Sequence, residues 1–228
     1  MPKGLNQVLI EGFISLTAYP DIHYRKLKSA VANYLNCKDE NVSVGNGAVE
    51  IINNFIIAAK RVAVMTPAFS EYEERAKVHE KVIRKIPYKK DFSMDLDLIQ
   101  PIEEGELLVL GNPNNPTGLR IAKDELLEIY EIVKMKNAFL LLDEAFYEFC
   151  PEDYDSVELF KEDGYQNVAI IRAATKFFAL PGIRLGYSCT SVEKAKEISQ
   201  IELPWSVNSL ADIAGQYIFN DDEYIFYA

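Results

Sequence analysis

The sequence predicts an α/β fold in three layers, in which helices cover both faces of a mainly parallel sheet. Short, purely apolar segments alternate along the chain with longer segments in which apolar residues recur with the period of a helix. Apolar strands joined by helices are typical of parallel sheets that are buried on both faces. The 228 residues, 49% of them hydrophobic, can bury a substantial core as one large domain, or as one domain and part of another.

The alternation begins near residue 21 in the first half of the chain. Pro20 and Asp21 mark a turn, with Asp21 as a candidate helix cap. Gly45 and Gly47 then separate a strand from an amphipathic helix. We expect helices over residues 21–36, from the Gly47 turn through residue 57, and over residues 70–79, with strands over residues 41–44 and 62–65.

The second half continues the same alternation. Apolar residues from 107 onward break into a loop rich in Asn, Pro and Gly, and a second purely apolar run ends at Asp143. Two further apolar runs flank the loop that contains Lys176. We expect strands from residue 107, up to residue 143, over residues 168–172 and over residues 183–187, with a helix over residues 123–134.

Composition and charge exclude several classes of partner. The formal net charge is −11, which opposes binding to nucleic-acid phosphates, and no basic amphipathic segment suits a membrane surface. No segment approaches the roughly 20 apolar residues of a membrane span, and the first residues lack the layout of a signal peptide. We therefore expect a cytoplasmic protein with no nucleic-acid or membrane partner.

Cysteine and histidine usage indicates no metal site. Cys37, Cys150 and Cys189 are widely spaced and match no metal-ligand pattern, so we expect free thiols rather than disulfides. His23 and His79 are equally isolated, and nothing in the sequence indicates convergent partners for a metal ion or a serine-type triad.

Lys176 is the first candidate for chemistry. It lies in a loop after an apolar strand, and Arg184 follows eight positions later. A buried amine among apolar neighbours is shifted toward its neutral, nucleophilic form, and the forked donors of a guanidinium suit a phosphate. The pair therefore suits a phosphorylated aldehyde, although a surface lysine and a strand-edge arginine would give the same pattern.

Three other segments place polar groups where ligands bind. The loop from Asn112 to Gly118 and the carboxylate of Asp143 both follow predicted strands, and the carboxyl ends of parallel strands form the ligand-binding edge of an open sheet. A helix that starts after Gly45 and Gly47 offers free backbone amides to an anion. The alternatives are a helix cap or surface ion pair for Asp143, and a simple turn for the glycines.

Together these segments resemble the fold-type I pyridoxal-phosphate enzymes of the class I/II aminotransferase family. They occur in the family's order, and the resemblance covers nearly all of the chain from about Tyr19 onward. It implies the large domain of that fold. The matching segments are residues 45–50 (Gly-Asn-Gly-Ala-Val-Glu), 112–118 (Asn-Pro-Asn-Asn-Pro-Thr-Gly), 143–146 (Asp-Glu-Ala-Phe) and 175–186 (Thr-Lys-Phe-Phe-Ala-Leu-Pro-Gly-Ile-Arg-Leu-Gly).

The resemblance implies a role for each of four side chains toward pyridoxal 5'-phosphate. Lys176 bonds covalently to its aldehyde and Asp143 pairs with its pyridine nitrogen. Asn115 donates a hydrogen bond to the phenolic oxygen, and Arg184 contacts the phosphate. A carboxylate against the ring nitrogen keeps that nitrogen protonated, so the ring can accept the electron pair released at the substrate's α-carbon.

Further cofactor contacts follow from the same resemblance. The phosphate lies over Gly47, Ala48 and Val49 at the start of a helix, and Phe69 stacks on the ring. Tyr19 reaches across a homodimer interface to the partner's phosphate. The alternatives are a core phenylalanine for Phe69 and a turn before a helix for Tyr19.

Two features of the cofactor motifs depart from common relatives. Phe146 stands where histidinol-phosphate aminotransferases commonly have a tyrosine, so it cannot donate a second hydrogen bond to the phenolic oxygen. Ala173 stands where many relatives have a phosphate-binding hydroxyl, for which Thr175 partly compensates. The motifs around Phe146 and Lys176 are more similar to the threonine-phosphate decarboxylases of cobalamin synthesis.

We therefore expect a pyridoxal-phosphate enzyme that decarboxylates L-threonine O-3-phosphate, the alternative being a histidinol-phosphate-type aminotransferase. A noncatalytic module that binds the cofactor or a partner chain is the alternative from another class. The resemblance also implies a domain plan in which a C-terminal small domain, which supplies the arginine for the substrate carboxylate, is largely absent. In this plan residues 1–20 form an incomplete N-terminal cleft and dimer segment, residues 21–215 the cofactor-binding domain, and residues 216–228 the start of a helix toward the small domain.

Overall fold

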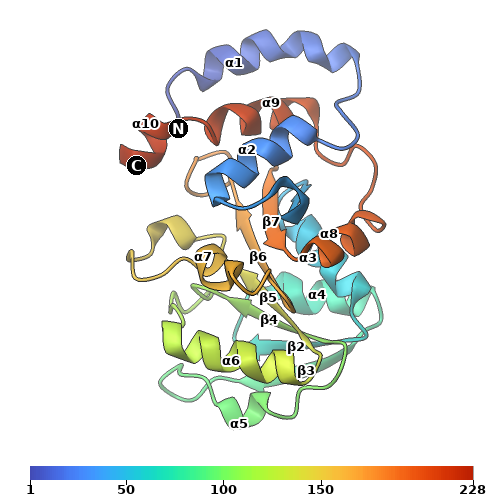
Figure 1. Ribbon diagram of the computed structural model, residues 1–228, viewed down its shortest axis with the longest axis vertical. Coiled ribbons are helices and arrows are strands. Elements are labelled where there is room, and N and C mark those ends of the chain that lie inside the picture. The colour runs from blue at the N-terminus through green and yellow to red at the C-terminus, as the bar shows by residue number, and fades with distance from the viewer. Residues whose placement is uncertain (228) are drawn as a thin grey trace.

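The computed structural model describes residues 1–227 and confirms the α/β fold. A seven-stranded sheet forms the middle layer, and helices cover both of its faces (Figure 1). Each strand except the edge strand β3 coincides with a short, largely apolar segment of the sequence. The strands are β1 (Val42–Gly45), β2 (Arg61–Thr66), β3 (Val82–Pro87), β4 (Glu106–Gly111), β5 (Phe139–Asp143), β6 (Val168–Ala173) and β7 (Gly186–Thr190).

The sheet is mainly parallel, as predicted. Its strand order is β1-β7-β6-β5-β4-β2-β3, and the central strands β2, β4, β5 and β6 run parallel. β7 is antiparallel to both of its neighbours, β1 and β6. Residues 174–185 connect β6 to β7 without a crossover helix, and a parallel pair would need such a crossover.

Helices connect most of the strands and pack on the two faces. The sheet separates α3 and α4 from α6 and α7 (Figure 1). Short 3₁₀ segments occupy residues 13–17, 39–41 and 147–149. The α-helices of the described residues are α1 (Leu5–Gly12), α2 (Arg25–Leu35), α3 (Ala48–Ala58), α4 (Ser70–Val78), α5 (Leu96–Ile99), α6 (Lys123–Met135), α7 (Ser156–Lys161), α8 (Val192–Ser199), α9 (Ser209–Ile218) and α10 (Asp222–Tyr227).

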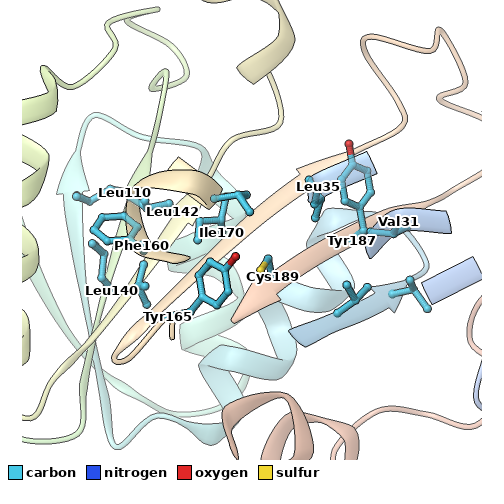
Figure 2. Close-up of a cluster of buried hydrophobic side chains, with 14 of the residues drawn as sticks. Val31, Leu35, Leu110, Leu140, Leu142, Phe160, Tyr165, Ile170, Tyr187 and Cys189 are labelled. Carbon is cyan, nitrogen blue, oxygen red and sulfur yellow. The ribbon is translucent and has the colours of Figure 1, made fainter. Parts of the chain in front are cut away.

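Alternate residues of each central strand contribute to opposite halves of the core. On β4, Leu108 and Leu110 pack in the cluster that includes α2, α6 and α9, whereas Leu107 and Val109 pack with α3 and α4. Figure 2 shows part of the first cluster, where Leu110 lies near Phe160 of α7. Burial on both faces explains why these strands are continuously apolar rather than alternating with polar residues.

Two strands differ from the sequence prediction. β7 begins at Gly186 rather than at residue 183, because the chain turns after Pro181 and Arg184 has a left-handed φ of +64°. β3 was not predicted at all. It is an edge strand with a partly exposed Arg84 and an exposed Lys85, so it lacks the apolar pattern of the central strands.

The helices near the two ends also differ from expectation. α2 begins at Arg25 rather than at residue 21, and Asp21 instead accepts hydrogen bonds from the amides of His23 and Arg25 at 3.2 and 3.1 Å. The helix expected from residue 216 is interrupted, because α9 ends at Ile218 and α10 begins four residues later. Ala228, the last residue of that expected helix, lies outside the described residues.

α1 lies along α9, far from it in sequence (Figure 1). Leu5 of α1 is fully buried, and the Tyr217 hydroxyl of α9 donates to the Lys3 carbonyl oxygen at 2.5 Å. Among the described residues, no helix combines the length and the apolar character that a membrane crossing requires.

Candidate functional site

A cavity of about 180 Å³ opens at the carboxyl ends of the parallel strands. It lies where four strand-end loops meet the start of α3, which is the edge of the sheet that the sequence predicted. Most of the predicted cofactor residues line it. The lining residues are Ala48, Val49, Ile52, Phe69, Tyr72, Pro113, Asn115, Asp143, Ala145, Phe146, Ala173, Thr175, Lys176 and Arg184.

Asp143 ends β5 between two neighbouring parallel strands and is only 8% exposed. Its Oδ2 accepts a hydrogen bond from the Tyr72 hydroxyl at 2.7 Å, and its Oδ1 accepts one from the Ala145 amide at 3.1 Å. Burial raises the pKa of Asp143, and these two hydrogen bonds oppose the shift. The carboxyl is therefore held at the cavity by the fold rather than by a cation.

Tyr72 is a site residue that sequence reasoning missed. It is buried on α4, three positions after Phe69, and the two rings meet edge to face with centroids 5.6 Å apart. Residues three apart lie on the same side of a helix. That spacing was a signal that Tyr72 would accompany Phe69, but nothing local indicated its bond to Asp143.

Lys176 lies at the edge of the cavity, and the expectation that it is buried is wrong. The residue is exposed, because the loop after β6 leaves the sheet before the lysine is reached. Its Nζ is 5.2 Å from the centre of the Phe146 ring. Within residues 1–227 no acidic group pairs with this amine, which therefore faces the cavity without an ion pair.

Arg184 lines the cavity and lies against Gly47. Arg184 is exposed, and its Nη1 donates to the Pro181 carbonyl oxygen at 3.4 Å. Gly47 has φ +82° and precedes α3, and a Cβ placed on it would overlap the Arg184 guanidinium. Arg184 itself has a left-handed φ of +64°. Such a φ is a strained conformation for a non-glycine residue, and strained residues cluster at functional sites. The arginine therefore lies beside the first-turn amides of α3.

The remaining predicted residues divide into two groups. Asn115, Phe146 and Thr175 line the cavity beside Lys176. Tyr19 does not line it: its side chain is 79% exposed and its ring lies 4.6 Å from that of Trp205. The structure therefore brings most of the predicted cofactor residues together around one cavity and leaves Tyr19 on the surface.

A buried ionic network connects the ends of the strands next to the cavity. Arg172, on β6, is 3% exposed and pairs with Glu144 at 2.9 Å and with Asp155 at 2.7 Å. Glu144 also accepts hydrogen bonds from Asn112 at 3.0 Å and from Ser156 at 2.5 Å. The network fixes the ends of three adjacent strands, and the sequence did not predict it.

Comparison with known proteins connects this geometry to a family. A family model described as aminotransferase class I and II matches residues 6–225. A protein of Caldanaerobacter subterraneus subsp. tengcongensis named "Putative threonine-phosphate decarboxylase" is 40% identical over 219 residues, which cover 93% of this chain and 59% of the relative. A histidinol-phosphate aminotransferase of Clostridium novyi is 30% identical over 234 residues, which cover 99% of this chain and 64% of the relative.

A solved structure extends the comparison to three dimensions. The histidinol-phosphate aminotransferase from Clostridium acetobutylicum has a TM-score of 0.90 and 36% sequence identity, and the match covers 99% of this chain and 68% of that chain. The chain thus spans 59% and 64% of the two curated relatives above. The matched part contains the cavity and every residue that lines it.

Proposed function

Because the chain belongs to the class I and class II aminotransferase family, we propose that it is the cofactor-binding part of an enzyme that decarboxylates L-threonine O-3-phosphate with pyridoxal 5'-phosphate. One observation carries the proposal. A single cavity joins the Lys176 amine, the Asp143 carboxyl and the Arg184 guanidinium. These are the three kinds of group that an aldehyde, a pyridine nitrogen and a phosphate require.

The residues around the cavity fit this cofactor. Gly47 leaves room for the Arg184 guanidinium next to the start of α3, so a cation and free helix amides face the same space. Asp143 accepts one hydrogen bond on each oxygen, which leaves further lone pairs for a ring N–H. When bound, the cofactor supplies an electron sink for the pair released at the substrate's α-carbon.

Each side chain has one task in the proposed reaction. The Lys176 amine would hold the cofactor's aldehyde, and it would move a proton at the substrate's α-carbon. Asp143 holds the proton on the pyridine nitrogen. Asn115 donates to the phenolic oxygen, and Phe69 stacks on the ring, a contact worth about 0.5–1.5 kcal/mol beyond its area burial. Arg184 and the first amides of α3 hold the phosphate.

Decarboxylation is preferred to transamination on two grounds. The relative with 40% identity is named as a decarboxylase, and Phe146 at the cavity cannot donate a hydrogen bond as a tyrosine would. Histidinol-phosphate-type transamination is the second candidate, and the 36% identity to the Clostridium acetobutylicum enzyme supports it. Both reactions use a phosphorylated substrate.

The reaction is tested on the full-length protein that contains this chain. With threonine phosphate we expect release of carbon dioxide without formation of a keto acid. Lys176→Ala should abolish the release, whereas Lys196→Ala, which removes an exposed lysine of α8, should not change it. Keto acid formed from an added amino donor, with no carbon dioxide, would instead establish transamination.

The noncatalytic alternative has its own test. Borohydride should fix the cofactor to Lys176 in the full-length wild-type protein and should fail to do so in Lys176→Ala. Threonine phosphate should then shift the visible absorption of an untreated sample. Fixation at Lys176 without any spectral response to substrate would support a binding module.

We also propose that the protein is a cytoplasmic homodimer in which Tyr19 reaches the partner's cavity. The segment directly after α1 carries exposed apolar side chains, among them Phe13, Ile14 and Leu16. A contiguous exposed apolar surface indicates a protein contact. Three unpaired cysteines support a reducing compartment.

A further inference from the structure

A second cavity, of about 350 Å³, lies beside the cavity that Lys176 and Asp143 line. The loop after β4 and the turn after β5 form its walls, so it belongs to the same edge of the sheet. We call the first the cofactor cavity and the second the side cavity. Pro113, Asn115 and Phe146 line both, whereas Lys176 and Asp143 line only the cofactor cavity. The proposed reaction therefore gives the side cavity no role of its own.

Apolar rings form most of the wall of the side cavity. The rings are those of Pro113, Pro116, Phe146, Phe149 and Pro151. Walls of this kind, with a few polar groups among them, are typical of sites for small organic ligands. An inorganic ion could not bury apolar surface against these rings, whereas a ligand with an apolar body could.

Arg120 is the single charged residue in the wall of the side cavity. Its side chain is only 10% exposed. The Nη2 atom pairs with Asp153 at 3.0 Å and also donates to the Tyr154 carbonyl oxygen. The other two guanidinium nitrogens, Nε and Nη1, are buried and have no hydrogen-bond acceptor among the described residues.

The ion pair with Asp153 compensates the charge of Arg120 only in part. The Asp153 side chain is 47% exposed, so solvent screens it, whereas the guanidinium is almost fully buried. Arginine keeps its proton in proteins, and a buried cation without matched acceptors is unfavourable. An anionic oxygen brought into the side cavity would supply the acceptor that the fold does not.

Two tyrosine rings hold the guanidinium in place. Its Cζ lies 4.1 Å from the centre of the Tyr154 ring and 5.5 Å from the centre of the Tyr147 ring. Tyr147 begins the 3₁₀ turn after β5, and its carbonyl oxygen accepts a hydrogen bond from the Cys150 amide at 2.9 Å. The cation is thus fixed before a ligand arrives, which lowers the entropy lost on binding.

We propose that the side cavity binds a small carboxylate that carries an apolar ring, of which benzoate is the simplest probe. The carboxylate pairs with the Arg120 guanidinium, and the ring packs against the proline rings and Phe149. The site does not depend on the proposed reaction, because the groups assigned to that reaction line the cofactor cavity. Since Asn115 and Phe146 line both cavities, a ligand in the side cavity contacts residues that also face the cofactor cavity.

Cys150 reports occupancy in the full-length protein, because it is half-buried and lines the side cavity. We expect benzoate to slow its alkylation by iodoacetamide in a saturable manner, which peptide mass spectrometry measures. Benzyl alcohol, which lacks the carboxylate, and acetate, which lacks the ring, should protect less at equal concentration and ionic strength. Cys37 lines a different cavity, so its alkylation should not respond. Equal protection by benzyl alcohol would overturn the proposal.

The Arg120 side chain gives a second measurement that does not depend on thiol reactivity. Its Nε–H signal in NMR spectra should shift with benzoate concentration, because the guanidinium gains an anionic partner. Arg184→Met removes the cation of the cofactor cavity and should leave both the shift and the protection of Cys150 unchanged. An Arg120 signal that does not move, or responses that vanish in Arg184→Met, would contradict a ligand in the side cavity.

Two substitutions change the charge of the side cavity in opposite directions. Arg120→Met removes the cation and should abolish the protection of Cys150. Asp153→Asn removes the competing acid, so half-protection should need about two- to fivefold less benzoate, the range for one exposed ion pair. Because Asp153 is exposed, its variant keeps the test valid if Arg120→Met does not fold. Protection retained in a folded Arg120→Met protein, or an unchanged benzoate requirement in Asp153→Asn, would count against the site.

Discussion

Among single residues, Asp143 is the clearest case of a group placed at a cost to stability. A buried carboxyl without a cation is unfavourable when ionised, and only the Tyr72 hydroxyl and the Ala145 amide offset that cost. Positions that lower stability in this way are typical of functional sites. A bound pyridine N–H would supply the missing partner.

We expect Asp143→Asn to stabilise the protein without cofactor by about 1–3 kcal/mol at neutral pH, because it removes a buried charge. The folded-state pKa of Asp143 is raised above its ordinary value of 3.8, so the folded protein binds this proton more readily than the unfolded chain. The wild type therefore loses stability as the pH rises above 3.8, and the advantage of the variant should grow in that direction. Urea unfolding at several pH values measures it. A variant that is less stable at neutral pH would contradict the expectation.

Tyr72→Phe should lower the free energy of unfolding by about 1.5–3 kcal/mol, the range for a hydrogen bond to a charged group. In the wild type the Tyr72 hydrogen bond lowers the pKa of Asp143. Without that bond, the pKa of Asp143 should rise further in the variant. Urea unfolding and NMR titration of the Asp143 carboxyl carbon provide the two measurements. Tyr217→Phe removes a more exposed hydroxyl bond, to the Lys3 carbonyl oxygen, and should cost less. An unchanged Asp143 titration would argue against this contact.

At the level of elements, the start of α3 depends on the glycine that precedes it. Gly47 has φ +82° and ψ +162°, a region that is essentially restricted to glycine. Gly47→Ala should therefore destabilise the protein by about 1–3 kcal/mol and weaken phosphate binding by displacing Arg184. Gly118→Ala is the matched control, since Gly118 also has a positive φ but open space around it. Equal loss of cofactor affinity in both variants would exclude a specific role for Gly47.

The junction of β5 and β6 depends on the ion pair beneath the cavity. Arg172→Met leaves Glu144 buried without its cation, so we expect a loss of about 3–5 kcal/mol in urea unfolding. Arg172→Met combined with Glu144→Met should recover much of it, because the unpaired charge is gone. Arg184→Met, at an exposed arginine, should change stability by no more than about 0.5 kcal/mol. A small effect of Arg172→Met would mean that water reaches Glu144.

For the whole molecule, the exposed position of Tyr19 leads to a test of the proposed dimer. If each cavity takes its tyrosine from the partner, a mixture of full-length Lys176→Ala and Tyr19→Ala proteins forms hybrid dimers with one intact site. We expect activity in the mixture, after subunit exchange, that neither variant has alone. Recovery should be absent when both substitutions are placed in one chain and mixed with Lys176→Ala. No recovery in the first mixture would contradict a shared site.

Much of the fold followed from local patterns. The continuous apolar runs of β4 and β5 predicted buried parallel strands, and the polar residues after them predicted the edge where the cavity lies. β3 escaped prediction because its pattern is that of a charged edge strand. The start of β7 was misplaced because the sequence around Arg184 is apolar while its backbone turns.

The sequence by itself determined where most of the strands lie and which polar groups end them, because burial on a helix or strand repeats with a short period. Its four ordered motifs determined which family the chain resembles. Only the tertiary structure decided that Lys176 is exposed and that Tyr72 bonds Asp143 across 71 positions. Those facts depend on the order in which the strands pack. No local period records that order, since it is set by the summed packing of the whole sheet.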